Sequence, residues 1–320
     1  MRGFIIAAGA LLAASVAAAP PAAAQLEGLE IIAPASPGGG WDQTARAMQN
    51  ALQEAGLAQN VQVMNIPGAG GTIGLAQFVT SKEGEGEALL VSGLVMLGAI
   101  LTNDSPVTID QSTPMARLTG EYEVIVVPAN SELQTLDDLI AQFKEDPRSV
   151  SWGGGSAGGT DHILVGLIAK EAGVEASGIN YVPFSGGGEA LASLLGGHVT
   201  AGVSGYGEWA GQIEAGELRV LAISSAERVD GIDAATLKEQ GVDVELTNWR
   251  GVLAPPGISD DDKKALADAI EGMVESEAWQ GILEERGWLD LYMPPDEFAQ
   301  FVQEDQEQIE TVLKDIGLVQ

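Results

Sequence analysis

Apolar extended segments alternate with helix-like segments along nearly the whole chain, and this order limits the possible folds more than any other feature. Residues 29–33 are strand-like and are followed by a helical repeat at 42–55, in which Ala45, Met48 and Leu52 recur at helical spacing. Such an alternation predicts open, mostly parallel sheets that are covered by helices. Further strands are expected at 61–66, 88–92, 122–128, 150–152, 199–203 and 220–224, and further helices at 72–81, 135–144, 161–172, 189–195 and over most of 260–316.

The expected strands are too many for one small sheet, and no flexible linker separates two consecutive domains. Two apolar extended segments, "YEVIVVP" at 122–128 and "NWRGVLAP" at 248–255, are candidates for crossovers into a second domain and back. We therefore expect an α/β fold with two lobes, each a mostly parallel sheet flanked by helices, joined by two crossover strands with a cleft between them. Lobe 1 is expected to comprise residues 25–123 and 250–320, and lobe 2 residues 124–249.

Residues 1–24 have the pattern of a secretory signal peptide. Arg2 supplies a positive start, residues 4–19 are an apolar run, and the alanines that end at Ala24 fit the small-residue cleavage rule. We expect cleavage after Ala24, so that the mature chain begins at Gln25 and is exported to the periplasm. A retained membrane anchor is the alternative, but the apolar run is short for a membrane span and its end is rich in proline and alanine.

The composition excludes several kinds of site and partner. The chain has no cysteine, hence no disulfide or thiol chemistry, and with only two histidines neither a transition-metal site nor a cofactor is expected. Asp and Glu number 46 against 15 Lys and Arg, and the formal net charge of −31 argues against nucleic acid or an anionic membrane surface as a partner. A surface this acidic suits a salty medium, where self-repulsion is screened.

Four strand-to-helix turns are rich in glycine and are the main candidates for a binding site: "SPGGGWD", "PGAGGTIG", "GGGSAGGTD" and "FSGGGEA". Such a turn directs free backbone N–H groups and the positive end of a helix toward the carboxyl edge of the sheet, which suits an anion. The loops at 36–42, 153–160 and 185–188 contain no Lys or Arg. We therefore expect an anion to be held by backbone dipoles, hydroxyl groups and water, without a cation.

Two enzyme motifs fall in the segment "GGGSAG" at 153–158. It matches the dinucleotide pattern G-x-G-x-x-G, but the match is weak in a chain with 42 glycines and has no well-placed acidic residue after it. It also contains G-x-S-x-G, which would make Ser156 a nucleophile if a histidine followed at the right place. Only His162 and His198 follow, and we expect them to pack beneath the loop and to lie on the surface, respectively. An exported serine hydrolase that uses Ser156 remains an alternative.

The residues directly after the first glycine run have more than one possible role. Asp42 and Asp161 both fall in the first turn of an expected helix, where an acid complements the helix dipole, and Asp42 can also tie down its loop by accepting N–H bonds. Trp41 either packs onto the core of its lobe or forms an aromatic wall beside the ligand, and the sequence does not choose between the two.

Six segments, taken in chain order, resemble the substrate-binding receptors of tripartite tricarboxylate transporters, the TctC or Bug family. The resemblance covers nearly all of the chain after residue 24 and implies a periplasmic binding protein fold of type II that closes on a small carboxylate. It also implies a monomeric receptor that delivers its ligand to the integral membrane permease subunits of the transporter. The six segments are "PGGGWDQTAR", "NIPGAGGTIG", "GGGSAGGTDHIL", "YVPFSGGGEALASLLGGHV", "IEAGELRVLAISSAERV" and "RGVLAPPGI".

The resemblance also implies a set of ligand-binding residues. Where many family members read Phe-Asp-Asn, this chain has Val203-Ser204-Gly205 and then Tyr206, a departure that we interpret as the loss of a carboxylate from the cleft wall. This interpretation favours a more highly charged, citrate-like di- or tricarboxylate, to which Ser204 or Tyr206 can donate. A carboxylate receptor that serves a sensor kinase remains a further alternative. The expected ligand-binding residues are Ser36, Pro37, Gly38, Gly39, Gly40, Trp41, Asp42, Ser92, Ser156, Gly159, Thr160, Ser204 and Tyr206.

Overall fold

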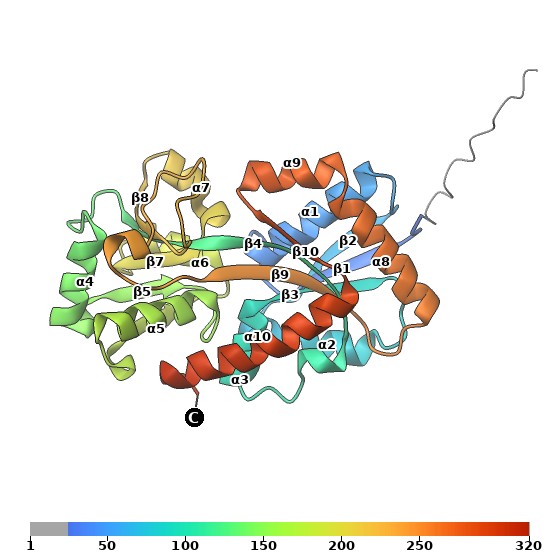
Figure 1. Ribbon diagram of the computed structural model, residues 1–320, viewed down its shortest axis with the longest axis horizontal. Coiled ribbons are helices and arrows are strands. Elements are labelled where there is room, and N and C mark those ends of the chain that lie inside the picture. Colours follow the sequence, from blue (N-terminus) through green and yellow to red (C-terminus); the bar gives the residue numbers. More distant parts are fainter. Residues whose placement is uncertain (1–24, 320) are drawn as a thin grey trace, which may run out of the picture.

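A continuous mixed sheet of ten strands runs through two lobes in the part of the chain that the structure describes (Figure 1). The structure is a computed structural model that describes residues 25–319, and the signal peptide expected at residues 1–24 lies outside this range. None of the helices in the described range combines the length and the hydropathy of a membrane span.

Three parallel strands form the centre of lobe 1, and each is followed by a helix. The third helix, at Leu94–Thr102, was not expected from the sequence. It lies in an almost unbroken apolar run at residues 88–101, where a strand and a buried helix have the same pattern. The elements are β1 (Leu29–Ala33), α1 (Gly40–Glu54), β2 (Val61–Asn65), α2 (Thr72–Ser81), β3 (Ala88–Gly93) and α3 (Leu94–Thr102).

Lobe 2 repeats this arrangement of three parallel strands, each followed by a helix, and adds one helix before them and one strand after them. The elements are α4 (Leu136–Glu145), β5 (Ser151–Gly154), α5 (Thr160–Ala172), β6 (Asn180–Pro183), α6 (Gly187–Leu195), β7 (Ala201–Gly205), α7 (Tyr206–Glu214) and β8 (Leu218–Ile223).

Two long strands connect the lobes. β4 (Thr113–Pro128) pairs antiparallel with β9 (Thr247–Ala254) as far as Tyr122, and from Glu123 onward it pairs with β7 and then β8. The sequence predicts only the second half of β4, because register shifts interrupt the strand pattern between Pro114 and Thr119. β9 also pairs with β3, which gives the strand order β2-β1-β3-β9-β4-β7-β5-β6. The expected lobe boundaries at residues 123–124 and 249–250 stay a prediction.

The C-terminal region returns to lobe 1 and then reaches back to lobe 2. It comprises α8 (Asp260–Val274), α9 (Glu277–Arg286), β10 (Leu289–Met293), which pairs with β4, and α10 (Pro295–Asp315). The end of α10 touches α5 of lobe 2: Lys170 Nζ lies 2.8 Å from Asp315 Oδ2, and Ile316 packs against Gly166. β10 was not expected, because its five residues fall in a break between two helical patterns.

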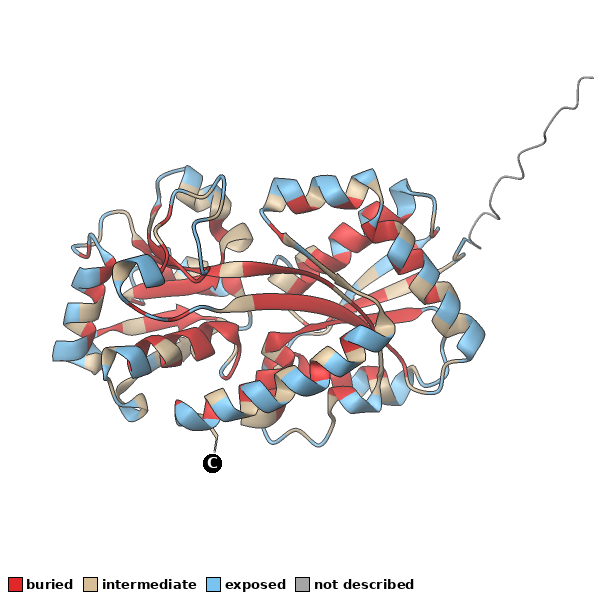
Figure 2. Ribbon diagram, in the orientation of Figure 1, coloured by how far each residue is buried: buried red, intermediate tan, exposed pale blue. Residues whose placement is uncertain are grey.

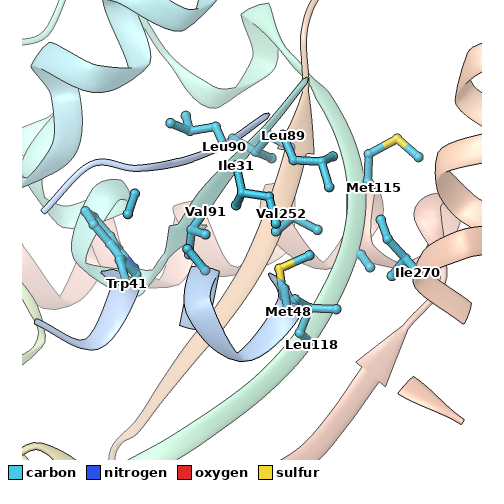
Figure 3. Close-up of a cluster of buried hydrophobic side chains, with 14 of the residues drawn as sticks. Ile31, Trp41, Met48, Leu89, Leu90, Val91, Met115, Leu118, Val252 and Ile270 are labelled. Carbon is cyan, nitrogen blue, oxygen red and sulfur yellow. The ribbon is translucent and has the colours of Figure 1, made fainter. Parts of the chain in front are cut away.

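Buried residues follow the strands through both lobes (Figure 2). One core fills lobe 1, and two smaller cores are formed by residues of lobe 2. Strands β1 and β3 are hydrophobic and almost wholly buried, as expected where helices cover both faces of a parallel sheet. The indole of Trp41 belongs to the lobe 1 core and lies at one side of the cluster that Figure 3 shows.

Candidate functional site

A cavity of about 350 Å³ lies between the two lobes. Both lobes and the crossover strand β9 contribute to its wall. The lobes approach each other closely beside it: a Cβ atom on Gly70 of lobe 1 would lie 3.5 Å from Ser156 Cβ of lobe 2, and one on Gly186 would lie 3.9 Å from Gly39 Cα. The contacts that bring the lobes together therefore also border this space, which stays open on one side.

Four helices, α1, α2, α5 and α6, begin at the cavity wall. The first N–H groups of a helix have no partner within the helix, and the helix dipole places a partial positive charge there. Converging helix starts of this kind suit an anion in the cavity between them. The wall residues at these starts are Gly39 and Gly40, Gly70 and Gly71, Gly159 and Thr160, and Gly186 and Gly187.

Asp42 holds the first glycine loop in shape. Its Oδ2 accepts hydrogen bonds from Gly38 N (2.8 Å) and Arg46 Nε (3.0 Å), and its Oδ1 accepts one from Asn65 Nδ2 (2.9 Å). Burial works against the charge, but the hydrogen bonds from Arg46, Gly38 and Asn65 outweigh it and lower the pKa of Asp42. The carboxylate therefore stays ionised and fixes Gly38, whose φ of 85° favours glycine.

Trp41 combines the two roles that the sequence left open. Its side chain is 7% exposed and packs in the lobe 1 core, yet the residue also lines the cavity. The indole ring lies close to two glycines. A Cβ atom on Gly71 would lie 2.5 Å from Trp41 Cζ3, and one on Gly93 would lie 3.3 Å from Trp41 Nε1. These glycines let the indole lie between core and cavity, and its contact with a ligand stays a prediction.

The turn at the start of α5 is held by buried polar contacts. Asp161 accepts a hydrogen bond from Gly155 N, Tyr181 donates to Gly155 O (2.8 Å), and Thr160 Oγ1 donates to Asn248 Oδ1 (3.2 Å) across to β9. Burial raises the pKa of Asp161 to about 6, and the hydrogen bond from Gly155 limits that rise.

His162 supports this turn from below, as expected. Its Nδ1 accepts a hydrogen bond from Gly158 N (3.2 Å), and its ring stacks on Tyr181 with 4.0 Å between ring centroids. Burial lowers the pKa of His162 to about 4, so the ring is neutral and can accept this bond. Among residues 25–319, no hydrogen bond joins Ser156 to either histidine.

The structure separates the expected ligand-binding residues into two groups, although contact with a ligand stays a prediction for all of them. Ser92 is fully buried and donates to Met96 Sδ (3.4 Å), and Tyr206 begins α7 outside the wall. Gly39, Gly40, Trp41, Ser156, Gly159, Thr160 and Ser204 line the cavity, whereas Ser36, Pro37, Gly38, Asp42, Ser92 and Tyr206 lie outside its wall.

The expectation of a site without a cation is wrong, because Arg250 lines the cavity. Side chains alternate along a strand, so Asn248 and Arg250 of β9 face the cavity while Trp249 faces away and donates to Asp305 Oδ2 (2.7 Å). Arg250 is 2% exposed and forms an ion pair with Glu121 of β4. Burial, with the nearby charge of Arg286, lowers the pKa of Arg250 to about 9. An arginine within a crossover strand was the signal in the sequence for this group.

The interpretation that the departure at Val203-Ser204-Gly205 removes a carboxylate from the cleft wall stays a prediction, but the wall holds a carboxylate at another position, Glu208. α7 begins at Tyr206, so Glu208 falls in its first turn and lines the cavity. Burial and the charge of Asp161 raise the pKa of Glu208 to about 8, although the N–H groups of Gly40 and Gly187 oppose the rise. A more highly charged ligand therefore no longer follows from the departure at Ser204.

The comparisons with known proteins show a family and a fold for this chain. The family model described as "Tripartite tricarboxylate transporter family receptor" matches residues 44–318. The structure of the periplasmic binding protein BugD superposes with a TM-score of 0.83 at 21% sequence identity, over 92% of this chain and 98% of that chain.

Two proteins solved with carboxylates have the same fold. MatC (Rpa3494) from Rhodopseudomonas palustris with bound malate superposes with a TM-score of 0.79 at 22% identity, over 90% of this chain and 99% of that chain. Rpa4515 of R. palustris with adipate superposes with a TM-score of 0.81 at 23% identity, over 91% of this chain and 97% of that chain. The chain thus has the α/β fold of the periplasmic binding proteins.

Proposed function

The chain belongs to the tripartite tricarboxylate transporter receptor family, and from this membership we propose that it captures a small organic di- or tricarboxylate between its lobes. We further propose that it works outside the cytoplasm as a monomer, binds its ligand without turnover, and delivers it to the integral membrane permease subunits of a tripartite tricarboxylate transporter.

The observation that carries this proposal is the convergence of four helix starts on one cavity between the lobes. Backbone N–H groups and positive helix ends bind carboxylates strongly where water is excluded, because the local dielectric constant is low. Starts from both lobes meet at the cavity, so a carboxylate that binds there contacts both and stabilises the closed form.

The ligand class is supported by size and by the relatives. A cavity of about 350 Å³ lies at the lower end of the range of roughly 300–1,000 Å³ for small-molecule sites. Malate and adipate, which are bound in the two R. palustris proteins, are dicarboxylates of different length. We therefore place dicarboxylates first and citrate-like tricarboxylates second.

A thermal-shift screen with mono-, di- and tricarboxylates tests this proposal. Malate, adipate or citrate is expected to raise the melting temperature in a saturable way, because a ligand at about 100 times its Kd adds roughly 2.7 kcal/mol to the free energy of unfolding. Acetate, with one carboxylate, serves as the matched weak ligand, and sodium chloride at equal ionic strength controls for screening.

Two results would contradict the proposal. The first is a melting temperature that no carboxylate raises beyond the sodium chloride control. The second is hydrolysis of a generic ester that disappears in Ser156→Ala, since this would favour the exported hydrolase.

A further inference from the structure

Three charged side chains from different elements meet at the end of the cavity next to the crossover strands. Arg250 of β9 pairs with Glu121 of β4, and Glu208 of α7 places its Oε1 3.8 Å from Arg250 Nη2. The Arg250 and Glu121 side chains are 2% and 1% exposed, and that of Glu208 is 11% exposed. Arg250 and Glu208 therefore lie next to each other in the cavity wall, and Glu208 is the more exposed of the two.

The Glu208 carboxylate also lies at two helix starts, one in each lobe. A Cβ atom on Gly40, the first residue of α1, would lie 2.8 Å from Glu208 Oε1, and one on Gly187, the first residue of α6, would overlap Oε2. We call the place formed by Gly40, Gly187 and Arg250 the hinge anion site. A carboxylate there meets one guanidinium and two positive helix ends.

Arg250 has capacity for a further carboxylate. A guanidinium offers five N–H donors, and Arg250 Nη1 is buried without a hydrogen-bond partner among residues 25–319. A buried donor without a partner costs free energy, which an added acceptor recovers. Glutamate has three rotatable side-chain bonds, so the Glu208 carboxylate can leave the site while α7 stays in place.

We propose that Glu208 is a tethered competitor at the hinge anion site, and that one carboxylate of the ligand displaces it to bind Arg250 and the starts of α1 and α6. This inference rests on the proposed function, because it assumes a carboxylate ligand. It adds Arg250 as a ligand-binding residue. It also means that Glu208 lowers the affinity for an anionic ligand, because the ligand has to replace the Glu208 carboxylate.

The competition depends on pH. The pKa of Glu208 is raised to about 8, so below this pH the side chain is mostly neutral and competes weakly, and above it the charged carboxylate competes strongly. Affinity for a dicarboxylate is thus expected to fall as the pH rises through about 8. The charged and titratable groups that act on this pair are Glu121 and Glu123 of β4, Asp161 of α5 and Arg286 of α9, and Glu189 of α6 lines the same cavity.

The test measures malate binding by calorimetry in wild type, Glu208→Ala and Glu208→Gln, at about pH 6.5 and about pH 8.5. Both variants are expected to bind malate about tenfold more tightly than wild type at the higher pH, with a smaller gain at the lower pH. Glu214→Ala, which removes an exposed charge from the other end of α7, is the matched control and should follow wild type at both pH values.

The outcomes distinguish this inference from the proposed function. If wild type binds malate and both Glu208 variants bind it equally or more weakly at the higher pH, the inference is overturned while the receptor function stands. If neither wild type nor the variants bind malate, adipate or citrate, the proposed function fails and the inference fails with it. Circular dichroism of each variant shows that the fold is intact.

Discussion

Asp42 shows how one residue determines whether a glycine loop can serve as a binding surface. The loop has little conformational preference of its own, because glycine loses more backbone entropy on ordering than any other residue. The carboxylate of Asp42 supplies the missing constraint through its bonds to Gly38, Arg46 and Asn65. The sequence predicted this function of Asp42 because the bond to Gly38 is local, whereas the bond from Asn65, 23 residues away, was not predictable.

Replacing Asp42 with alanine is expected to lower the free energy of unfolding by about 1–3 kcal/mol, because hydrogen-bond donors around it lose their acceptor. Malate affinity should also fall, since the loop no longer holds Gly39 and Gly40 in place. The lowered pKa of Asp42 means that its stabilisation is present above its unfolded pKa and is lost as the pH falls through its folded pKa. Urea unfolding and calorimetry measure the two effects.

The control for this variant is Asp137→Ala, which removes an exposed acid from the first turn of α4, where it complements the helix dipole. This variant should lose only the part of the free energy of unfolding that comes from the interaction with the helix dipole, and its malate affinity should be unchanged. Equal losses of stability in the two variants would show that Asp42 acts through the helix dipole alone.

At the scale of elements, the sequence predicted the parts whose signals are local and missed those that depend on pairing. Glycine turns and helical periodicity located the starts of α1, α2, α5 and α6. β10 and the first half of β4 are recognised only through their pairing with each other and with β9. Arg250 was missed for the same reason, because the register of β9 decides which of its faces meets the cavity.

The start of α1 carries a prediction that belongs to this scale. A Cβ atom on Gly40 would overlap the Arg250 guanidinium, so Gly40→Ala is expected to push Arg250 out of place and weaken malate binding by about tenfold or more. Gly188→Ala is the matched control in the first turn of α6, because a Cβ atom there meets nothing within 4 Å. Calorimetry that gave Gly40→Ala the affinity of wild type would exclude the start of α1 from the site.

For the whole molecule, charge and fold act in opposite directions on an anionic ligand. The formal net charge of −31 repels a dianion in solution, whereas the helix starts and Arg250 attract it inside the cavity. The two-lobed fold was predictable from the number of strands and the lack of a linker. The balance of charges within the cavity was not, because the acidic and basic residues that form it are far apart in the sequence.

The association rate of malate is therefore expected to rise severalfold with added salt, as the Debye length falls from about 30 Å at 0.01 M to about 8 Å at 0.15 M. The dissociation rate should change little, because contacts with buried groups such as Arg250 are poorly screened by salt. Stopped-flow tryptophan fluorescence can follow both rates, since Trp41 lines the cavity. An association rate that fell with sodium chloride would show that the outer charge does not oppose entry.

The strand β4 belongs to both halves of the sheet, and this has a consequence for how the lobes separate. Because β4 changes its pairing partner between Tyr122 and Glu123, the lobes can turn relative to each other through small dihedral changes in β4 and β9 at this point, with neither ladder broken. The backbone then contributes little to the barrier for opening, and the barrier comes from the contacts across the cavity and from those of α10 with α5. The time for which a ligand remains bound then depends mainly on the contacts that the ligand itself makes with the two lobes.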